Sequence, residues 1–404
     1  MPTVGQLDSL RVRLASRFEP AEPLAGIAEL ATRYDRPLSV AIVRSDGIGD
    51  WIMSLGIVDG LLASPAVGRL TIVAPGGYRS LLGHRDGVAF EPFEAPTIIA
   101  PPSPGGTIGK ALALSRFGQR RAIRAGAARR GRFDLAVLPR WDTDAGFNAR
   151  AWALGAGAVL AGHDPSLVPG AGPREREERA LIAIRTSDDR AAAHDTAHAA
   201  SLAEALGVPV VAPAGAGLRQ FGVERGSRSR PLVLVHAGSN EPRRRWPVER
   251  WRDVIVELAA TGAEIVLVGG PEDVEVYTRI TAGLGVDVRS VAGQMPLGEL
   301  PELAAQATLL VGNDSGPAHV ACSVGTPVVV ISNHPVDGDP AYRTSPSRFG
   351  PWVEASRLLR PAYAIQPCVG FCSAPEAHCI AAVRADEVVA ASIELLAGTA
   401  GDAS

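Results

Sequence analysis

The sequence predicts an α/β protein with two parallel-sheet domains. Short apolar runs rich in β-branched residues alternate with helical patterns along the chain, as in a parallel sheet covered by helices on both faces. The alternation comes in two series, which begin near residues 38 and 232. A chain of 404 residues with 46% hydrophobic and 21% charged residues is long enough for two ordinary hydrophobic cores.

The first series begins with a predicted strand at 38–43 (LSVAIV) and a helical pattern over 51–62. Further strands are expected where short apolar runs recur, at 70–74, 135–138 and 159–161. Residues 211–230 are rich in Pro, Gly, Ser and Arg and lack periodicity, so they are predicted to be a linker. Residues 1–210 are therefore predicted to form the N-terminal domain.

The second series predicts a C-terminal domain over 231–380. Its elements are a strand from 232, a helix at 248–260, a strand at 264–268, a helix near 272–282, and strands at 308–311 and 327–331. A last amphipathic helix, within 381–404, is expected to pack back on the N-terminal domain. Parallel sheets bind ligands beyond the carboxyl ends of their strands. Two such sheets facing each other across a ligand cleft would form the GT-B architecture.

The most informative segment is 308–331, where Asn-Asp-Ser-Gly-Pro opens a short helix between two strands. Asp314 or Ser315 is expected to cap that helix, and Pro317 fits its first turn. The N–H groups of this turn lie beside the carboxylate of Asp314 and the imidazole of His319, which predicts a site for a phosphate-bearing ligand. The alternative is an ordinary capped crossover without a ligand.

Two further turns carry candidate chemistry. The turn at 44–50 (RSDGIGD) has spaced glycines but lacks the third glycine of a dinucleotide motif. It ends at Asp50, which is either a favourable helix-terminal charge or a base that takes a proton from an acceptor hydroxyl. The turn after Val235 holds small polar residues followed by three arginines, a pattern suited to a diphosphate. Of these arginines, Arg244 is expected to stabilise a departing phosphate, whereas the neighbouring Trp246 is predicted to be a packing residue.

These motifs, in this order, resemble glycosyltransferase family 9, the bacterial ADP-heptose lipopolysaccharide heptosyltransferases. The resemblance rests on RSDGIGDWIMSLGIVDGL, HAGSNEPRRRWPVERW, VGGPEDVE and GQMPLGELPELAAQATLLVGNDSGPAHVACSVGTPVVVIS. It implies a GT-B fold and an inverting, metal-independent transfer of a heptose-like sugar from a nucleotide-diphospho-sugar. The resemblance also implies an ADP-linked donor and an acceptor hydroxyl on a cell-envelope glycolipid or polysaccharide.

The resemblance also implies roles for individual residues. Asp50 matches the proposed catalytic base, and Arg244 stands where the family usually has a phosphate-binding lysine, which changes the geometry of the contact. Met295 matches a residue packing near the base, and Glu272 is the alternative to Asp273 as the acid that contacts the donor. The donor-binding positions are Gly49, Ser239, Asn240, Asp273, Met295, Asp314, Ser315, Gly316 and His319.

Acceptor binding is predicted from two weaker features. Asp142 and Asp144 form a D-x-D pair. It is an acceptor contact, a chance pair without a ligand or, less in keeping with two parallel sheets, a metal site as in another glycosyltransferase fold. Arg120 and Arg121 lie in an arginine-dense helical segment. That segment is either a solvated face or a patch for an anionic acceptor or membrane surface.

The tail contains Cys368-x3-Cys372-x6-Cys379 with His378 beside the last cysteine. Zinc is one interpretation, but the spacing is not that of a standard zinc motif. Packing residues with a redox disulfide are the other interpretation, and no metal or cofactor is assigned. Four cysteines in a chain of this length do not indicate a disulfide framework.

Composition limits the partners and the location. The formal net charge of −3 does not indicate a nucleic-acid partner. The sequence has no apolar run long enough to span a membrane and no secretory signal at its N-terminus, so a cytoplasmic location is expected, with peripheral contact at the inner face of the membrane. Rival functions are a glycosyltransferase of the same fold with another donor or acceptor, another GT-B enzyme such as a sugar-nucleotide epimerase, a silent nucleotide-sugar-binding paralogue and, more distantly, an NAD-dependent oxidoreductase.

Overall fold

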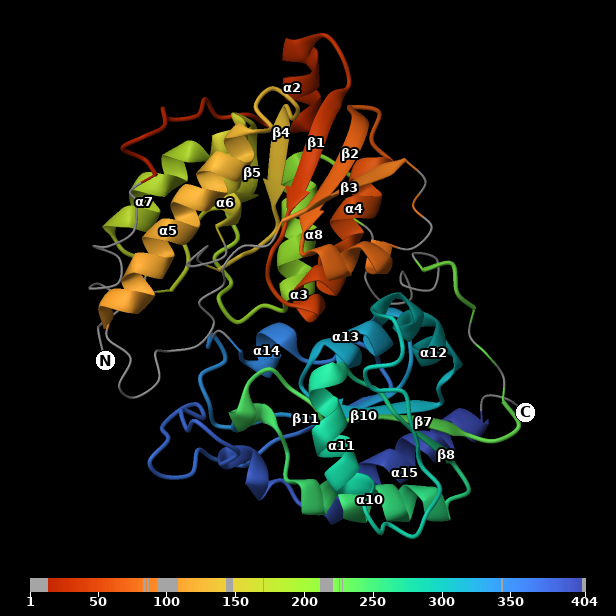
Figure 1. Ribbon diagram of the computed structural model, residues 1–404. Helices are drawn as coiled ribbons and strands as arrows, with labels where there is room; N and C mark the ends of the chain where they lie inside the picture. Colours follow the sequence, from red (N-terminus) through yellow and green to blue (C-terminus); the bar gives the residue numbers. More distant parts are fainter. Residues whose placement is uncertain are drawn as a thin grey trace. The chain divides into compact units, whose positions relative to one another are not determined.

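The computed structural model describes residues 14–82, 85, 87–93, 108–142, 148–169, 171–210, 221–224, 226, 228–342 and 344–401. The chain divides into two compact units. The N-terminal unit contains the described residues of 1–79, 85–191 and 195–211, and the C-terminal unit contains those of 80–84, 192–194 and 212–404. Each unit is built on one six-stranded sheet (Figure 1).

The N-terminal sheet has the strand order β3-β2-β1-β4-β5-β6, and every pair of neighbouring strands is parallel. Its strands are β1 (Leu38–Val43), β2 (Val67–Ala74), β3 (Val88–Pro92), β4 (Leu135–Leu138), β5 (Val159–His163) and β6 (Ile184–Thr186). Its helices are α2 (Ile27–Tyr34), α3 (Ile48–Met53), α4 (Leu55–Leu62), α5 (Ile108–Ala127), α6 (Ala149–Ala156), α7 (Pro173–Glu178) and α8 (Asp195–Leu206). The 3-10 turn η2 (Arg179–Leu181) also belongs to this unit, and the 3-10 turn η1 (Gly76–Leu82) begins in it.

The helix expected over 51–62 is two helices, α3 and α4, which meet at Ser54. The Ser54 hydroxyl donates to the carbonyl of Asp50, four residues earlier, at 2.9 Å. A serine bonded in this way bends a helix. The candidate base Asp50 lies in the first turn of α3, shortly after the end of β1.

Helices α5 and α6 lie side by side at very short range (Figure 1). Both contribute a glycine at the crossing: a Cβ added to Gly126 would lie 2.0 Å from the Trp152 carbonyl oxygen, and one added to Gly155 would lie 2.3 Å from that of Ile123. Larger residues cannot occupy these positions without moving the helices apart. The close approach buries Trp152 against Phe93 and Phe133, with ring centroids 6.1 and 5.7 Å apart.

The C-terminal sheet has the order β12-β11-β10-β7-β8-β9 and is also parallel throughout. Its strands are β7 (Leu232–His236), β8 (Glu264–Leu267), β9 (Arg289–Ser290), β10 (Leu309–Asn313), β11 (Val328–Ile331) and β12 (Ser356–Leu359). Its helices are α10 (Val248–Ala260), α11 (Val274–Thr281), α12 (Leu300–Gln306), α13 (Gly316–Ser323), α14 (Pro346–Phe349) and α15 (Ala385–Gly401). Its 3-10 turns are η3 (Pro242–Arg244), η4 (Pro271–Asp273), η5 (Leu297–Glu299) and η6 (Cys379–Ala382).

The last helix, α15, packs within the C-terminal unit, next to α10 (Figure 1). Its buried residues Val388, Ala391 and Leu395 belong to the same hydrophobic cluster as Trp251 and Val254 of α10. The expectation that this helix packs back on the N-terminal domain is therefore wrong. Its apolar face is already covered by the C-terminal sheet and α10.

Both sheets have the same order when their strands are numbered along the chain, 3-2-1-4-5-6. In such a sheet the order reverses between the first and fourth strands, and ligands bind beyond the carboxyl ends of these two strands. The predicted α/β class with two parallel sheets is confirmed. The reversal points lie between β1 and β4 in the N-terminal unit and between β7 and β10 in the C-terminal unit.

Within the described part of the chain, no helix is sufficiently long and apolar to cross a lipid bilayer.

Candidate functional site

In the C-terminal unit, Asn313 fixes the two strand ends at the reversal point. It is the last residue of β10 and is fully buried. Its Nδ2 donates to the Ala237 carbonyl at 2.8 Å, and its Oδ1 accepts from the Trp246 N–H at 3.3 Å. One side chain therefore holds the turn after β7 and the end of the arginine run against the end of β10.

A second polar chain lies beside it. The Ser315 hydroxyl is 2.8 Å from His236 Nδ1, and His236 Nε2 is 3.5 Å from Asp273 Oδ2. Burial raises the pKa of Asp273, but the contact with His236 and the N–H of Gly270 outweigh it and hold that pKa below its ordinary value. The carboxylate also lies directly under the glycine turn after β7, because a Cβ on Gly238 would be 2.0 Å from Asp273 Oδ1.

This placement bears on the predicted acid contact with the donor. Asp273 is only 4% exposed and is engaged by its own unit, so it is placed to position His236 and the turn. Its neighbour Glu272, the alternative predicted from the sequence, is exposed. Of the two acids, Glu272 is the more exposed.

Arg244 and Asp314 form an ion pair at the start of α13, with Arg244 Nη2 2.8 Å from Asp314 Oδ2. Asp314 is buried, whereas the Arg244 side chain keeps 20% of its surface exposed. Ser315 is the N-cap residue, as predicted, but its hydroxyl does not bond the first turn of the helix. It donates to the Asn313 carbonyl at 2.9 Å instead, so it does not occupy the N–H groups at the start of α13.

The three arginines have different roles. Arg243 pairs with Glu241, and Arg245 Nε donates to the Ser239 carbonyl at 2.8 Å, so both brace the turn. Arg244 reaches the start of α13. Trp246 is 2% exposed, as expected of a packing residue, and its ring meets that of Trp251 at a centroid distance of 5.1 Å.

The other residues predicted to bind the donor lie either near the same reversal point or further from it. Ser239 is half-buried and accepts from the Glu241 N–H at 3.2 Å, while Asn240 is exposed. Gly316 is the first residue of α13, and His319 lies one turn later, 8% exposed and stacked on Trp352 at 5.5 Å between centroids. Met295 is half-buried in the segment after β9. Gly49 belongs to the other unit, where it is buried in the first turn of α3.

In the N-terminal unit, Arg44 lies immediately after β1 and is 3% exposed. Its guanidinium contacts three carboxylates: Nε is 2.8 Å from Asp46 Oδ1, and Nη2 is 3.4 Å from Asp50 Oδ1 and 3.3 Å from Asp195 Oδ2. A buried arginine can be retained in this way because its charge is matched and hydrogen-bonded. The result is a cluster of three carboxylates around the Arg44 guanidinium.

Asp50 lies in the first turn of α3, where its Oδ2 accepts from the Gly47 N–H at 3.1 Å. Its side chain is 23% exposed. Burial, with the negative charge of Asp46, raises the pKa of Asp50 to about 7, against the opposing effect of Arg44 and Arg140. Asp50 is thus a helix-cap acceptor and, at the same time, a carboxylate poised to take a proton near neutral pH.

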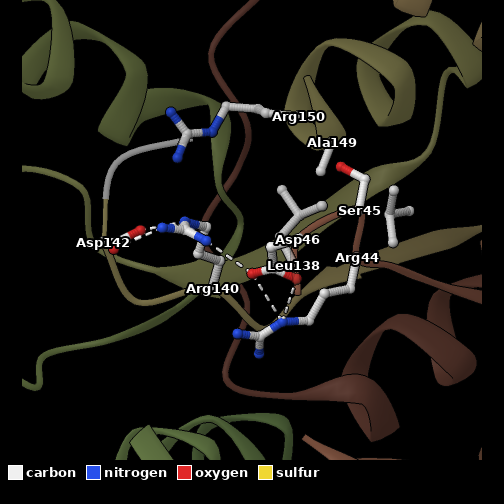
Figure 2. A pocket seen from close by; sticks show the side chains of 9 residues that line it. Arg44, Ser45, Asp46, Leu138, Arg140, Asp142, Ala149 and Arg150 are labelled. Carbon is white, nitrogen blue, oxygen red and sulfur yellow. Dashed lines mark hydrogen bonds and ion pairs between the residues drawn. The ribbon is translucent and has the colours of Figure 1, made fainter. Parts of the chain in front are cut away.

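A pocket lies beyond the carboxyl ends of β1 and β4 (Figure 2). Arg140, just after β4, lies between Asp46 and Asp142, with Nη1 2.8 Å from Asp46 Oδ2 and Nη2 2.7 Å from Asp142 Oδ2. Arg150, which also pairs with Glu178, lines another side of the pocket. The lining residues are Val43, Arg44, Ser45, Asp46, Leu138, Arg140, Asp142, Ala149 and Arg150.

The structure separates the acceptor-binding predictions. Asp142 lines this pocket, whereas Asp144 lies outside the described residues. Arg120 and Arg121 are exposed on α5 and do not line the pocket.

Sequence reasoning did not identify Arg44, Arg140, His236 and Asn313 as site residues. All four are polar residues at the carboxyl end of a strand next to a reversal point, or one or two residues after it. Once the strand order is known, polar residues at this position can be identified in the sequence as candidates for the site.

The cysteine-rich tail forms its own cluster. Atoms of Cys368, Cys372, His378 and Cys379 lie within 4.8 Å of one another. The three cysteines are buried and present as thiols.

Comparison with known proteins agrees with the predicted resemblance. The family described as glycosyltransferase family 9 (heptosyltransferase) matches residues 186–376. The lipopolysaccharide heptosyltransferase 2 of Escherichia coli (strain K12) is 31% identical over 110 residues, which are 26% of this chain and 32% of that protein. The lipopolysaccharide core heptosyltransferase OpsX of Haemophilus influenzae is 26% identical over 163 residues, 39% of this chain and 47% of that protein. The matches thus span about a third to a half of these curated relatives.

Solved structures share the fold over most of the chain. The ADP-heptose lipopolysaccharide heptosyltransferase II of E. coli aligns with a TM-score of 0.61 and 21% identity, covering 89% of this chain and 99% of that one. A glycosyltransferase family 9 protein from Veillonella parvula aligns with a TM-score of 0.63 and 18% identity, covering 89% and 98%. The fold is therefore that of the GT-B heptosyltransferases, and the resemblance to glycosyltransferase family 9 is confirmed in sequence over residues 186–376.

Proposed function

We propose that this protein is an inverting glycosyltransferase that moves a heptose-like sugar from an ADP-linked donor to a hydroxyl of a cell-envelope glycolipid or polysaccharide. The observation that carries the proposal is the ion pair of Arg244 and Asp314 at the start of α13, beside the turn after β7. A cation, a glycine turn and the N–H groups of a helix start form a site suited to a diphosphate. The curated relatives, which are lipopolysaccharide heptosyltransferases, support the choice of sugar.

In the proposed reaction, the acceptor oxygen attacks the anomeric carbon of the donor. Asp50 takes the hydroxyl proton, and its raised pKa of about 7 fits that task. The bond from the anomeric carbon to the diphosphate oxygen breaks, and the electron pair leaves with the nucleoside diphosphate. A single displacement inverts the configuration of the sugar.

Arg244 stabilises the charge that develops on the leaving diphosphate. The N–H groups at the start of α13 supply further donors, since the Ser315 hydroxyl bonds elsewhere. No step of this mechanism calls for a metal at the reacting atoms. Glu272, which is exposed beside the turn after β8, is proposed to accept from a ribose diol or sugar hydroxyl.

The acceptor contact that we favour is the pocket at β1 and β4. Arg140 and Asp142 offer charged groups there for a saccharide or phosphorylated acceptor. The exposed Arg120 and Arg121 on α5 are proposed to bind the anionic surface of the membrane that carries the acceptor. Replacing both with Gln should weaken binding to anionic vesicles and leave binding to neutral vesicles unchanged; equal binding by the wild type and the variant would refute this contact.

The decisive experiment follows nucleoside diphosphate release from ADP-, GDP-, UDP- and dTDP-sugars, with and without a heptose-deficient lipopolysaccharide acceptor. We expect ADP release from ADP-heptose that depends on the acceptor. Asp50→Asn should abolish it while ADP binding, measured by calorimetry, remains. Turnover of the donor without an acceptor would instead indicate an epimerase, and tight donor binding without release under any condition would indicate a silent binding protein.

A further inference from the structure

The segment between β12 and α15 gathers three cysteines and a histidine at one point. Cys368, Cys372 and Cys379 are 1%, 3% and 0% exposed, and His378 is half-buried beside them. Their ligand atoms all lie within 4.8 Å of one another. Three thiols and one imidazole are the ligand types that Zn²⁺ prefers in structural sites.

The distances fit a tetrahedral ion. For Zn–S of about 2.3 Å and Zn–N of about 2.0 Å, two ligands at the tetrahedral angle lie about 3.5 Å apart for a sulfur and a nitrogen. His378 Nδ1 lies 3.6 Å from Cys368 Sγ and 3.5 Å from Cys379 Sγ. The imidazole therefore faces both sulfurs through Nδ1 at the separation that a shared ion requires.

The surroundings of the sulfurs also suit a metal thiolate. Cys368 Sγ accepts from the Ser373 N–H at 3.4 Å and from the Ser373 hydroxyl at 3.6 Å. Donors of this kind stabilise a thiolate and orient metal ligands. A disulfide would join only two of the three cysteines and would leave the third sulfur and the imidazole unexplained.

We propose that Cys368, Cys372, His378 and Cys379 bind one structural Zn²⁺ ion. All four coordination positions are filled by the protein, so the site is closed and has no position for a substrate. A closed site is compatible with a sugar transfer that uses no metal at the reacting atoms. The proposed binding of zinc does not depend on the proposed function.

The site lies against the segment that carries Arg244. Arg243 Nη1 donates to the Cys372 carbonyl at 3.5 Å, and η3 contacts η6, the turn that begins at Cys379. Trp246 Nε1 donates to the Val383 carbonyl at 3.0 Å. A metal that orders 368–383 would therefore fix the arginine turn from outside, and this consequence for donor binding rests on the proposed function.

The test begins with the metal content of the full-length protein, purified without a metal-affinity tag and measured by elemental analysis and native mass spectrometry. We expect one zinc ion per chain. Cys368→Ser and Cys379→Ser should lose it, whereas Cys322→Ala, which removes the cysteine buried in α13, should retain it. Iron in place of zinc, no metal, or a mass loss that indicates a disulfide would overturn the proposal.

A milder variant covers the case in which the cysteine variants do not fold. His378→Asn removes one half-buried ligand and should release zinc to a chelator faster than the wild type does. Chelation of the wild type should lower the melting temperature and weaken ADP binding several-fold, since metal binding contributes to folding. A wild type that contains zinc but does not bind ADP would support the metal site and refute the donor site. A wild type that contains no metal as purified but binds ADP would refute the metal site and support the donor site.

Discussion

The charge of Asp46 should set the pH at which the proposed base works. Asp46 bonds both Arg44 and Arg140, each at 2.8 Å, and its negative charge raises the pKa of Asp50. Asp46→Asn removes that charge, so that the opposing effect of Arg44 and Arg140 on Asp50 is offset less. The pKa of Asp50 should then fall from about 7, by about one to two units.

The size of the effect on rate follows from the ionised fraction. With a pKa of about 7 for Asp50, about one tenth of the carboxylate is ionised at pH 6; after a fall of about 1.5 units, about three quarters is ionised. The kcat/KM for acceptor at pH 6, relative to its plateau, should therefore rise about eightfold in Asp46→Asn. The assay is a pH profile of acceptor-dependent ADP release, from pH 5 to 9.

A matched control is Asp59→Asn. It removes a carboxylate of α4 that pairs with Arg85, and it should leave the pH profile unchanged. If the kcat/KM of Asp46→Asn fell on the acidic side at the same pH as that of the wild type, the reasoning would be refuted. If Asp50→Asn kept residual activity that still fell on the acidic side near pH 7, the reasoning would be refuted as well.

The same raised pKa has a consequence for stability. Because Asp50 holds its proton more tightly in the folded state than in the unfolded state, it contributes stability below about pH 4 that is lost as pH rises through about 7. Asp50→Asn stays neutral at every pH. It should therefore melt higher than the wild type at pH 8 and show less difference at pH 5, in thermal denaturation experiments.

Two further predictions concern the C-terminal reversal point. Arg244→Ala should weaken ADP binding by about 1.5–3 kcal/mol, or about ten- to a hundredfold, because it removes a charge-assisted contact and leaves Asp314 unpaired near the phosphate. Calorimetry would measure this, and an unchanged affinity would contradict it. Gly238→Ala should lower the melting temperature by an amount equivalent to about 1–3 kcal/mol, because the new Cβ would lie 2.0 Å from Asp273 Oδ1. Gly77→Ala, where nothing lies within 4 Å of the new Cβ, is the control and should melt like the wild type.

The strands that the sequence did not reveal lie at the sheet edges. Those predicted, such as β1, β4 and β7, are central and read as apolar runs because both of their faces are covered. The edge strands β3, β9 and β12 have no fully buried residue, and β6 is only three residues long. Local hydrophobicity therefore identified the centre of each sheet and missed its borders.

The site divides in a similar way. Residues in glycine-rich turns, such as Asp50 and Ser315, were predicted because the turn itself is visible in the sequence. Arg44 was not, since its contact with Asp195 joins residues 151 positions apart. The four ligands of the proposed zinc site were visible in the sequence, but their irregular spacing gave no indication that the chain folds them around one point.

At position 244 this chain has an arginine where the family usually has a lysine. A guanidinium has five N–H donors in a planar fork, whereas an ammonium is a compact point charge on a flexible stem. The contact of Arg244 with Asp314 uses Nη2 and restricts the position of the guanidinium. A side chain held in place before the ligand arrives loses less conformational entropy when it binds. The carboxylate of Asp314 thus offsets the positive charge of Arg244 but holds its side chain in position. Recognition of a diphosphate at this site would therefore depend on directed hydrogen bonds more than on net charge.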